Sequence, residues 1–289
     1  MRRHLAPVRQ ADIGEKAFVA AQQHGLHKRG LKAHGLRLYR VCSRIKESAM
    51  PNPTAAMLVI GDEILSGRTR EANMHYLAGE VTKVGIDLME VRVVSDDPGA
   101  IVAAVRALSA GYDHVFTSGG IGPTHDDITA ENVAAAFDRP ISVRDDARAI
   151  LAAHYDARGQ ELNAARLRMA RIPDGAVLID NPISAAPGFT IANVHVMAGV
   201  PAIFQAMLAS VLPTLTGGAP ILSQTLEIRR GEGDIAGPLS DLAERYPDLS
   251  IGSYPFIRDG CYGAQIVMRG QDGARLDAAI SELAGMFPA

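Results

Sequence analysis

From residue 54 onward, apolar and polar positions follow one another in blocks that predict strands alternating with helices. Residues 56–60 form a short apolar run that ends at Gly61 and predicts a buried strand. Apolar residues then recur at helical spacing from Met74 to Val84, and Gly85 closes that helix. The next segments repeat the pattern, with strand 86–94, helix 98–111, strand 114–118 and helix 130–137.

The same pattern continues after residue 140 and indicates the fold class. It predicts helices over 145–154 and 161–171, strands over 176–179 and 190–197, and a helix over 201–212. Repeated strand–helix–strand units with runs of Val, Ile and Leu are typical of a parallel sheet that helices cover on both faces. We therefore expect an α/β protein whose ligands bind beyond the C-terminal ends of the strands.

The last part of the chain has a different order of elements. It predicts a strand over 225–229, a helix over 238–245, strands near Leu249 and over 263–268, and a helix over 276–286. We expect a small α+β domain over 216–289, after a main domain over 50–215. Packing is a sufficient role for the small domain, although Tyr254 and Arg258 are residue types that contact ligands.

Composition and cysteine content indicate an ordinary globular protein. The chain has 289 residues, of which 47% are hydrophobic and 21% are charged. No apolar run reaches the roughly 18 residues that a membrane helix needs, so we expect no membrane partner. Cys42 and Cys261 form no CxxC pattern, which argues against a zinc site and a disulfide framework. A reducing, cytoplasmic location fits this cysteine content.

Charge is divided unevenly along the chain. Of the 29 Lys/Arg and 32 Asp/Glu residues, positions 1–49 hold 11 and 3, which leaves 18 and 29 for positions 50–289, a net charge of −11. An acidic body argues against nucleic acid as a partner, because phosphate neutralisation needs a basic face. Residues 1–49 lack the apolar centre of a secretory signal. We interpret them as a basic extension that is disordered or that precedes the true start at Met50.

The segment from Gly119 to Thr129 combines the features of an anion site. Three glycines and a proline follow a predicted strand and lead into a helix, for which Asp126, Asp127 and Thr129 are suitable N-caps. Such a turn directs backbone N–H groups and the positive end of the helix dipole toward one point. Two adjacent carboxylates would repel a bare phosphate, so the segment indicates phosphate with a divalent cation, Mg²⁺ by default. The simpler alternative is a tight turn whose acids only cap the helix.

Three predicted strand ends carry acidic pairs. Asp62-Glu63 follows the first strand, Asp96-Asp97 the second and Asp126-Asp127 the third. Each pair alone is explained as a solvated loop or a helix cap. Their coincidence at equivalent ends of parallel strands favours a shared site for a metal and a polar ligand.

Known nucleotide-binding and hydrolase signatures do not occur in the sequence. There is no GxxxxGK[ST], the glycine turn is not GxGxxG because His125 stands at its last position, and there is no GxSxG elbow. A P-loop NTPase, a nicotinamide oxidoreductase and a serine hydrolase are therefore disfavoured.

These motifs resemble the MoaB/Mog molybdopterin-binding domain, and above all its version in the competence/damage-inducible protein A (CinA) family. The resemblance rests on GDEILSG at 61–67 followed by Asn73, and on SGGIGPTxDDxT at 118–129. The NP at 181–182, APGF at 186–189 and GVP at 199–201 are similar to later motifs of that family. The resemblance to the CinA family covers about residues 54–289.

The resemblance implies a three-layer αβα fold with a mostly parallel sheet, a pterin or nucleotide phosphate at the glycine turn, and a homo-oligomer. In relatives that act in molybdenum cofactor synthesis, acids matching Asp96 and Asp127 support metal-dependent adenylyl chemistry. CinA-type relatives are linked instead to metal-dependent cleavage of dinucleotide pyrophosphates such as ADP-ribose or FAD.

This chain departs from the CinA family in two ways. The chain has no room for the C-terminal nicotinamide-nucleotide deamidase domain that is usual there, so we do not carry deamidase activity over. The glutamate that usually comes soon after Pro201 is replaced by Ala202-Ile203-Phe204. If that acid assists the metal site, activity would be weakened or lost.

We therefore expect a molybdopterin- or nucleotide-binding protein, with metal-dependent pyrophosphatase or adenylyl-transfer activity as the leading interpretation. Asp62, Asp96 and Asp127 would hold Mg²⁺ or Co²⁺, and Asp96 and Asp127 would be catalytic. The residues expected to bind the pterin or nucleotide are Asn73, Ser118, Gly119, Gly120, Gly122, Pro123 and Thr124. The alternatives are a non-catalytic binding or regulatory module, which the missing glutamate favours, and, less favoured, a structural protein.

Overall fold

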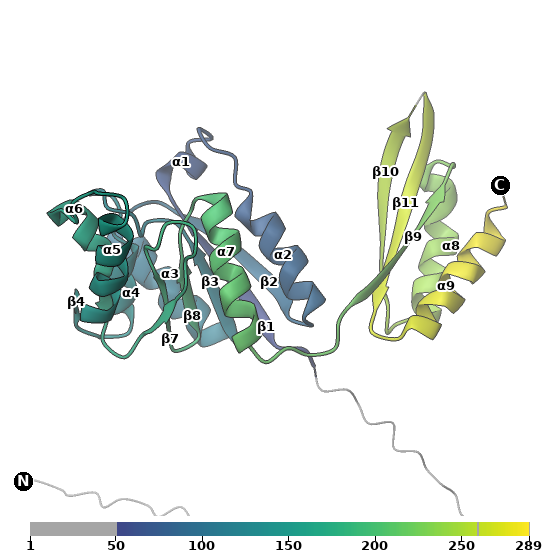
Figure 1. The fold of residues 1–289 in the computed structure, drawn as a ribbon. Coiled ribbons are helices and arrows are strands. Elements are labelled where there is room, and N and C mark those ends of the chain that lie inside the picture. The colour runs from purple at the N-terminus through teal and green to yellow at the C-terminus, as the bar shows by residue number, and fades with distance from the viewer. Residues whose placement is uncertain (1–50, 259, 289) are drawn as a thin grey trace, which may run out of the picture. The chain divides into compact units, whose positions relative to one another are not determined.

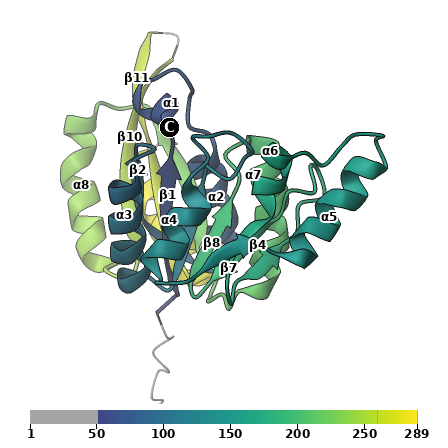
Figure 2. The same cartoon turned by 90° about the vertical axis from the view of Figure 1, so that its left-hand side faces the viewer.

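The structure is a computed structural model that describes residues 51–258 and 260–288. The basic extension expected over residues 1–49 lies outside the described residues. A six-stranded sheet with helices on both faces forms the larger domain, and a three-stranded sheet with two helices forms the smaller one (Figure 1, Figure 2). No helix in the described ranges is both long enough and apolar enough to cross a bilayer.

The elements of the larger domain alternate largely as the sequence predicts. Its strands are β1 (Thr54–Ile60), β2 (Asp87–Val94), β3 (His114–Ser118), β4 (Ile141–Val143), β5 (Arg171–Pro173), β6 (Val177–Ile179), β7 (Gly188–Ile191) and β8 (Val194–Met197). Its helices are α1 (Asp62–Leu65), α2 (Asn73–Lys83), α3 (Pro98–Gly111), α4 (Thr129–Ala136), α5 (Asp145–Asp156), α6 (Ala164–Leu167) and α7 (Pro201–Val211). Two 3-10 turns, η1 (Arg168–Ala170) and η2 (Leu212–Thr214), complete it.

The central sheet is mostly parallel, as expected. Its order is β2-β1-β3-β8-β7-β6, in which the first four strands run parallel and β7 and β6 run antiparallel. The carboxyl ends of β2, β1, β3 and β8 therefore meet at one edge. The Gly61 N–H donates to the Val94 carbonyl at 3.1 Å, and the Gly119 N–H donates to the Met197 carbonyl at 3.2 Å. The loops after the first three predicted strands thus lie together, as predicted.

Buried side chains on both faces of the sheet hold the helices in place. On one face α2 and α7 pack against it through Leu77, Val81, Phe204, Met207 and Leu208. On the other face α3 and α4 pack against it through Ile101, Val105, Leu108, Val133 and Ala136. This confirms the predicted three-layer αβα arrangement.

Residues 190–197, predicted as one strand, form the hairpin of β7 and β8 instead. The chain turns at Ala192, with φ 50°, and Asn193. The Asn193 amide donates to the carbonyl oxygens of Ser109 at 2.9 Å and Tyr112 at 2.8 Å. The prediction was wrong because the turn lacks a glycine, and because contacts with the end of α3 cannot be read from local sequence.

The helix predicted over 161–171 is also shorter than expected. The chain forms only α6 and η1 there, and β5 then pairs antiparallel with β4, with Arg171 opposite Val143. Ala170 and Ile172 are buried in the core that α3 and α4 share with the sheet. Burial of these side chains therefore ends the helix and places Arg168 on the 3-10 turn.

The smaller domain has an antiparallel sheet of order β10-β11-β9. Its elements are β9 (Leu222–Ile228), α8 (Glu232–Arg245), β10 (Ser250–Arg258), β11 (Cys261–Gly270) and α9 (Gly273–Met286). The helices α8 and α9 lie side by side on the sheet and bury Ile235, Leu242 and Leu276 (Figure 1). Helix α8 begins before the predicted start at Pro238, because burial of Ile235 outweighs the hydrogen bond lost at an internal proline.

Candidate functional site

Asn73, the first residue of α2, joins three segments at the carboxyl edge of the sheet. Its side chain is 4% exposed, and Nδ2 donates to Ser118 Oγ and to the Gly199 carbonyl oxygen, each at 2.8 Å. Ser118 ends β3, and Gly199 lies between β8 and α7. One amide therefore fixes the start of a helix, the end of a strand and the entry to α7 at the edge where ligands bind in such sheets.

The same side chain has an acceptor without a donor. Asn73 Oδ1 is buried and accepts no hydrogen bond from the residues that the structure describes. A buried oxygen of this kind costs about 1–3 kcal/mol when it is left unsatisfied. Such groups call for an explanation, for example a bound water molecule or a functional contact. Asn73 therefore has an acceptor available for a bound group.

Two adjacent glycines form a turn that requires glycine. Gly119 has φ 112° and Gly120 has φ 69°. A Cβ on Gly119 would lie 2.2 Å from the Ile60 carbonyl oxygen, and one on Gly120 would lie 2.1 Å from Thr129 Oγ1. The Thr129 hydroxyl donates to the Gly119 carbonyl, and the Thr129 N–H donates to the Gly120 carbonyl, each at 2.9 Å. The first residue of α4 thus holds the turn in one conformation.

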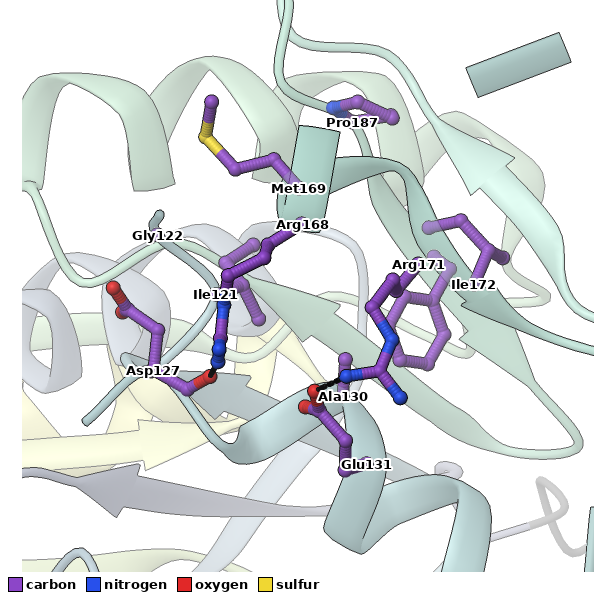
Figure 3. A pocket seen from close by; sticks show the side chains of 12 residues that line it. Ile121, Gly122, Asp127, Ala130, Glu131, Arg168, Met169, Arg171, Ile172 and Pro187 are labelled. Atoms are coloured by element: carbon purple, nitrogen blue, oxygen red, sulfur yellow. Dashed lines mark hydrogen bonds and ion pairs between the residues drawn. The ribbon is translucent and has the colours of Figure 1, made fainter. Parts of the chain in front are cut away.

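Two hollows open beside the glycine turn. The first, the Asn73 hollow, has about 370 Å³ of empty space including its mouth. It is lined by Val59, Ile60, Glu63, Ile64, Thr69, Arg70, Glu71, Ala72, Asn73, Ser118, Gly119, Gly199 and Pro201. The second, the Arg168 hollow, has about 330 Å³ on the same measure. It is lined by Gly120, Ile121, Gly122, Asp127, Ala130, Glu131, Arg168, Met169, Arg171, Ile172, Pro187 and Phe189 (Figure 3).

The residues predicted to bind a ligand are divided between these hollows. Asn73, Ser118 and Gly119 line the Asn73 hollow, and Gly120 and Gly122 line the Arg168 hollow. Pro123 and Thr124 line neither of the two. The glycine turn therefore separates the predicted site into two halves rather than enclosing one cavity.

Thr124 instead positions the acids of the turn. Asp127 Oδ2 accepts hydrogen bonds from the Thr124 N–H at 2.8 Å and from Thr124 Oγ1 at 2.5 Å. The Thr124 hydroxyl also lowers the pKa of the neighbouring Asp126 carboxyl below its ordinary value. Helix α4 begins after Ile128 without a side-chain cap, so the predicted N-caps Asp126, Asp127 and Thr129 were wrong. The Asp127 carboxylate accepts from Thr124, and the Thr129 hydroxyl donates to the Gly119 carbonyl, so neither side chain caps the helix.

Two helices begin at the Asn73 hollow, but only α7 has an N-terminus free of acidic side chains. The Glu71 carboxylate accepts the N–H groups of Asn73 at 2.8 Å and Met74 at 2.9 Å, and so caps α2. Helix α7 begins at Pro201 without a side-chain cap, and no acid occurs in its first turn. The missing family glutamate therefore leaves a positive helix end beside the hollow, an arrangement that suits an anion.

Arg168 and Arg171 of the second hollow were not predicted as site residues. Arg168 directs its guanidinium toward the Asp127 carbonyl oxygen, with Nη2 at 3.3 Å, and Arg171 forms an ion pair with Glu131 of α4 (Figure 3). No motif marks either arginine. Both fell within one predicted helix, and the pairing of β4 with β5 that positions them joins segments far apart in the sequence.

Comparison with known families assigns both domains. Residues 56–217 match the family described as a probable molybdopterin binding domain. The chain belongs to that family. The C-terminal part of the chain, residues 220–289, matches the middle domain of FAD synthase.

Individual relatives agree with this assignment. The chain is 31% identical over 255 residues to a probable FAD synthase of Caenorhabditis elegans, covering 80% of this chain and 49% of that protein. It is 32% identical over 199 residues to a protein of Archaeoglobus fulgidus, covering 69% and 84%. The chain thus spans about half the length of the FAD synthase that it matches.

A solved structure supports the resemblance to the CinA family. The crystal structure of the protein CinA from Thermoplasma acidophilum, described as being of unknown function, has 33% sequence identity and a TM-score of 0.52. The match covers 56% of this chain and 97% of that one. The predicted resemblance to the MoaB/Mog domain and the CinA family is therefore confirmed.

In the larger domain, the three acids expected to hold a metal do not form one cluster. Asp96 Oδ2 accepts the Asp62 N–H at 2.9 Å, so two of the loops meet, whereas Asp127 lines the Arg168 hollow. Within 51–258 and 260–288, no three His, Cys, Asp or Glu side chains are arranged to hold a metal ion. The residues present therefore do not fit a metal held by these three carboxylates.

Proposed function

We propose that this chain binds its ligand by a phosphate at the Asn73 hollow. The leading candidate for the ligand is a dinucleotide pyrophosphate such as FAD or ADP-ribose, and a pterin phosphate is the alternative. The observation that carries the proposal is the pair of 2.8 Å hydrogen bonds from Asn73 to Ser118 and Gly199. These bonds assemble the end of β3, the glycine turn and the start of α7 at one point. The matches to a molybdopterin-binding family and to FAD synthase support a nucleotide-related ligand.

Among the groups of the Asn73 hollow, Arg70 and the start of α7 favour a phosphate, whereas the carboxylates of Glu63 and Glu71 oppose it. Glu71 opposes an anion less than its charge implies, because it already accepts the N–H groups at the start of α2. The uncapped N-terminus of α7 then provides oriented N–H groups, which bind phosphate without a side chain.

Catalysis at this site would be cleavage of a pyrophosphate. A water oxygen attacks one phosphorus, the bond from that phosphorus to the bridging oxygen breaks, and FAD would yield AMP and the flavin monophosphate. Charge that develops on the leaving oxygen is stabilised by oriented N–H groups. Adenylyl transfer is the same substitution with a different acceptor. We assign Asp96 and Asp127 to this chemistry because acids matching them support adenylyl chemistry in the relatives that the motifs resemble. Asp96 lies in the loop after β2 and accepts the Asp62 N–H, and Asp127 lines the Arg168 hollow.

A second candidate is a binding module without turnover. The absence of the family glutamate after Pro201 favours it, as does the separation of Asp127 from the Asp62 and Asp96 loops. In this case the site retains its ligand and releases no AMP.

Calorimetric titration of the full chain separates these functions. FAD, ADP-ribose and a molybdopterin-type ligand are titrated with and without Mg²⁺ or Co²⁺, and the dinucleotide samples are then assayed for AMP. Binding with AMP release supports the enzyme, and binding without release supports the module. Failure of all three ligands to bind overturns the proposed function.

A further inference from the structure

Arg168 carries a positive charge that no carboxylate neutralises in the part of the chain that the structure describes. Its Nη2 donates to the Asp127 carbonyl oxygen at 3.3 Å, and its Nε is buried with no hydrogen-bond partner among the described residues. A guanidinium has five N–H donors in a planar fork. Buried donors without acceptors are rare in native proteins, so an oxygen-bearing group is expected to complete this one.

The other charged groups of the Arg168 hollow are already engaged. Arg171 pairs with Glu131 (Figure 3), and the Asp127 carboxylate accepts both hydrogen bonds from Thr124. Arg168 is therefore the cation of this hollow that remains available to a ligand. Arginine matches phosphate oxygens with two parallel hydrogen bonds, and these charge-assisted bonds are roughly twice as strong as neutral ones.

The two hollows share the glycine turn as their common boundary. Gly119 lines the Asn73 hollow and Gly120, the next residue, lines the Arg168 hollow. Consecutive Cα atoms lie about 3.8 Å apart, so two linked phosphates can lie along the turn with one toward each hollow. A single phosphate reaches only one of these positions at a time.

We infer that Arg168 binds the second phosphate of the ligand, so that the site selects pyrophosphate diesters over nucleoside monophosphates. The inference rests on the proposed function, because it requires the first phosphate to lie at the Asn73 hollow. Arg168 is thus a specificity-determining residue that sequence motifs do not mark, and it acts by direct contact with the ligand.

The test compares two ligands that share the adenosine monophosphate unit. ADP-ribose and AMP are titrated into the full chain and into Arg168→Gln. We expect Arg168→Gln to weaken ADP-ribose binding about tenfold or more while AMP affinity changes by less than about twofold. Arg168→Lys keeps the charge but loses the fork, and is expected to bind ADP-ribose with intermediate affinity.

Arg166→Gln is the matched control. Arg166 lies on α6, donates to the Glu161 carbonyl and stacks on Tyr155, and does not line the Arg168 hollow. Its loss is expected to leave both affinities unchanged. If Arg168→Gln fails to fold, the ADP-ribose to AMP affinity ratio of Arg168→Lys decides, since a structural role would weaken both ligands equally. An unchanged ADP-ribose to AMP affinity ratio overturns this inference and leaves the proposed function standing. A wild-type chain that binds none of ADP-ribose, AMP, FAD and the molybdopterin-type ligand overturns the proposed function as well.

Discussion

The side-chain amide of Asn73 donates to the hydroxyl oxygen of Ser118 at 2.8 Å and so joins the first residue of α2 to the last residue of β3. Both side chains are buried, at 4% and 3% exposed. The second N–H of the amide is taken by Gly199, which leaves its oxygen as the free acceptor. This one side chain therefore couples the stability of the sheet edge to the shape of the proposed site.

Asn73→Ala is expected to lower the free energy of unfolding by about 1–3 kcal/mol, because it leaves the Gly199 carbonyl and Ser118 hydroxyl without their donor. Urea unfolding of the full chain measures the change. Asn193→Ala is the matched control, since Asn193 also joins distant segments, at the other end of β3, through the carbonyls of Ser109 and Tyr112. A wild-type stability for Asn73→Ala would show that its hydrogen bonds do not organise the edge.

Gly119→Ala is expected to destabilise the chain by more than about 2 kcal/mol, because its Cβ would meet the Ile60 carbonyl in addition to the backbone strain. Gly67→Ala measures the cost of the backbone strain alone. Gly67 has φ 72° and open space around it, so its replacement is expected to cost only about 1–2 kcal/mol. Thermal or urea unfolding measures both variants. If Gly119→Ala and Gly67→Ala lost equal amounts of unfolding free energy, the contact of the new Cβ with the Ile60 carbonyl would cost nothing.

His195 is expected to make the fold less stable in mild acid. It is 4% exposed, lies 5.0 Å from the Phe116 ring, and shares a hydrogen bond of 3.0 Å with Thr190 Oγ1. Burial, and secondarily the charge of His114, lower its pKa from 6.5 to about 4. The native state stays neutral where the unfolded chain takes up a proton, so stability is full above about pH 6.5 and falls as the pH drops toward 4.

The size of this effect is about 2 kcal/mol between roughly pH 7 and pH 5. Unfolding free energies at both pH values are compared for the wild type and His195→Gln, and the variant is expected to lose that part of the pH dependence. His75→Gln, at an exposed position of α2, is the control and is expected to retain it. The same pH dependence in His195→Gln and wild type would contradict the assignment.

Asp127→Asn is expected to abolish AMP release if the chain is an enzyme, while leaving its unfolding curve unchanged. An asparagine oxygen can still accept the two hydrogen bonds from Thr124, so the turn is preserved and only the charge is lost. Asp126→Asn removes a neighbouring charge from the same exposed turn and is expected to retain activity. Full turnover by Asp127→Asn would remove this acid from the proposed chemistry.

Much of the fold could be predicted because its local patterns agree with its tertiary contacts. The apolar run of β3 and the helical spacing that ends at Gly85 both appear in the structure where the sequence places them. The hairpin at Ala192 could not be predicted, since its turn depends on hydrogen bonds from Asn193 to the end of α3. Local sequence carries no record of such distant partners.

The site, like the fold, could be predicted from the sequence only in part. Asn73, Ser118 and Gly119 come together as the strand order of a parallel sheet predicts. Arg168 was missed because its position depends on the pairing of β4 with β5 and on the burial of Ile172, both of which end a helix that the local pattern continues. The expected trio of metal ligands failed to gather because Thr124 and the Asp62 N–H take up the carboxylates of Asp127 and Asp96 separately.

Titration of ADP-ribose into wild type, Asn73→Ala and Asn193→Ala tests the central claim most directly. Both variants lose buried hydrogen bonds between distant segments, but only Asn73 lies at the proposed phosphate site. We predict that Asn73→Ala binds at least about tenfold more weakly than wild type and that Asn193→Ala stays within about twofold of it. Equal affinity in Asn73→Ala and Asn193→Ala would contradict the account and place the ligand away from the carboxyl edge of β3.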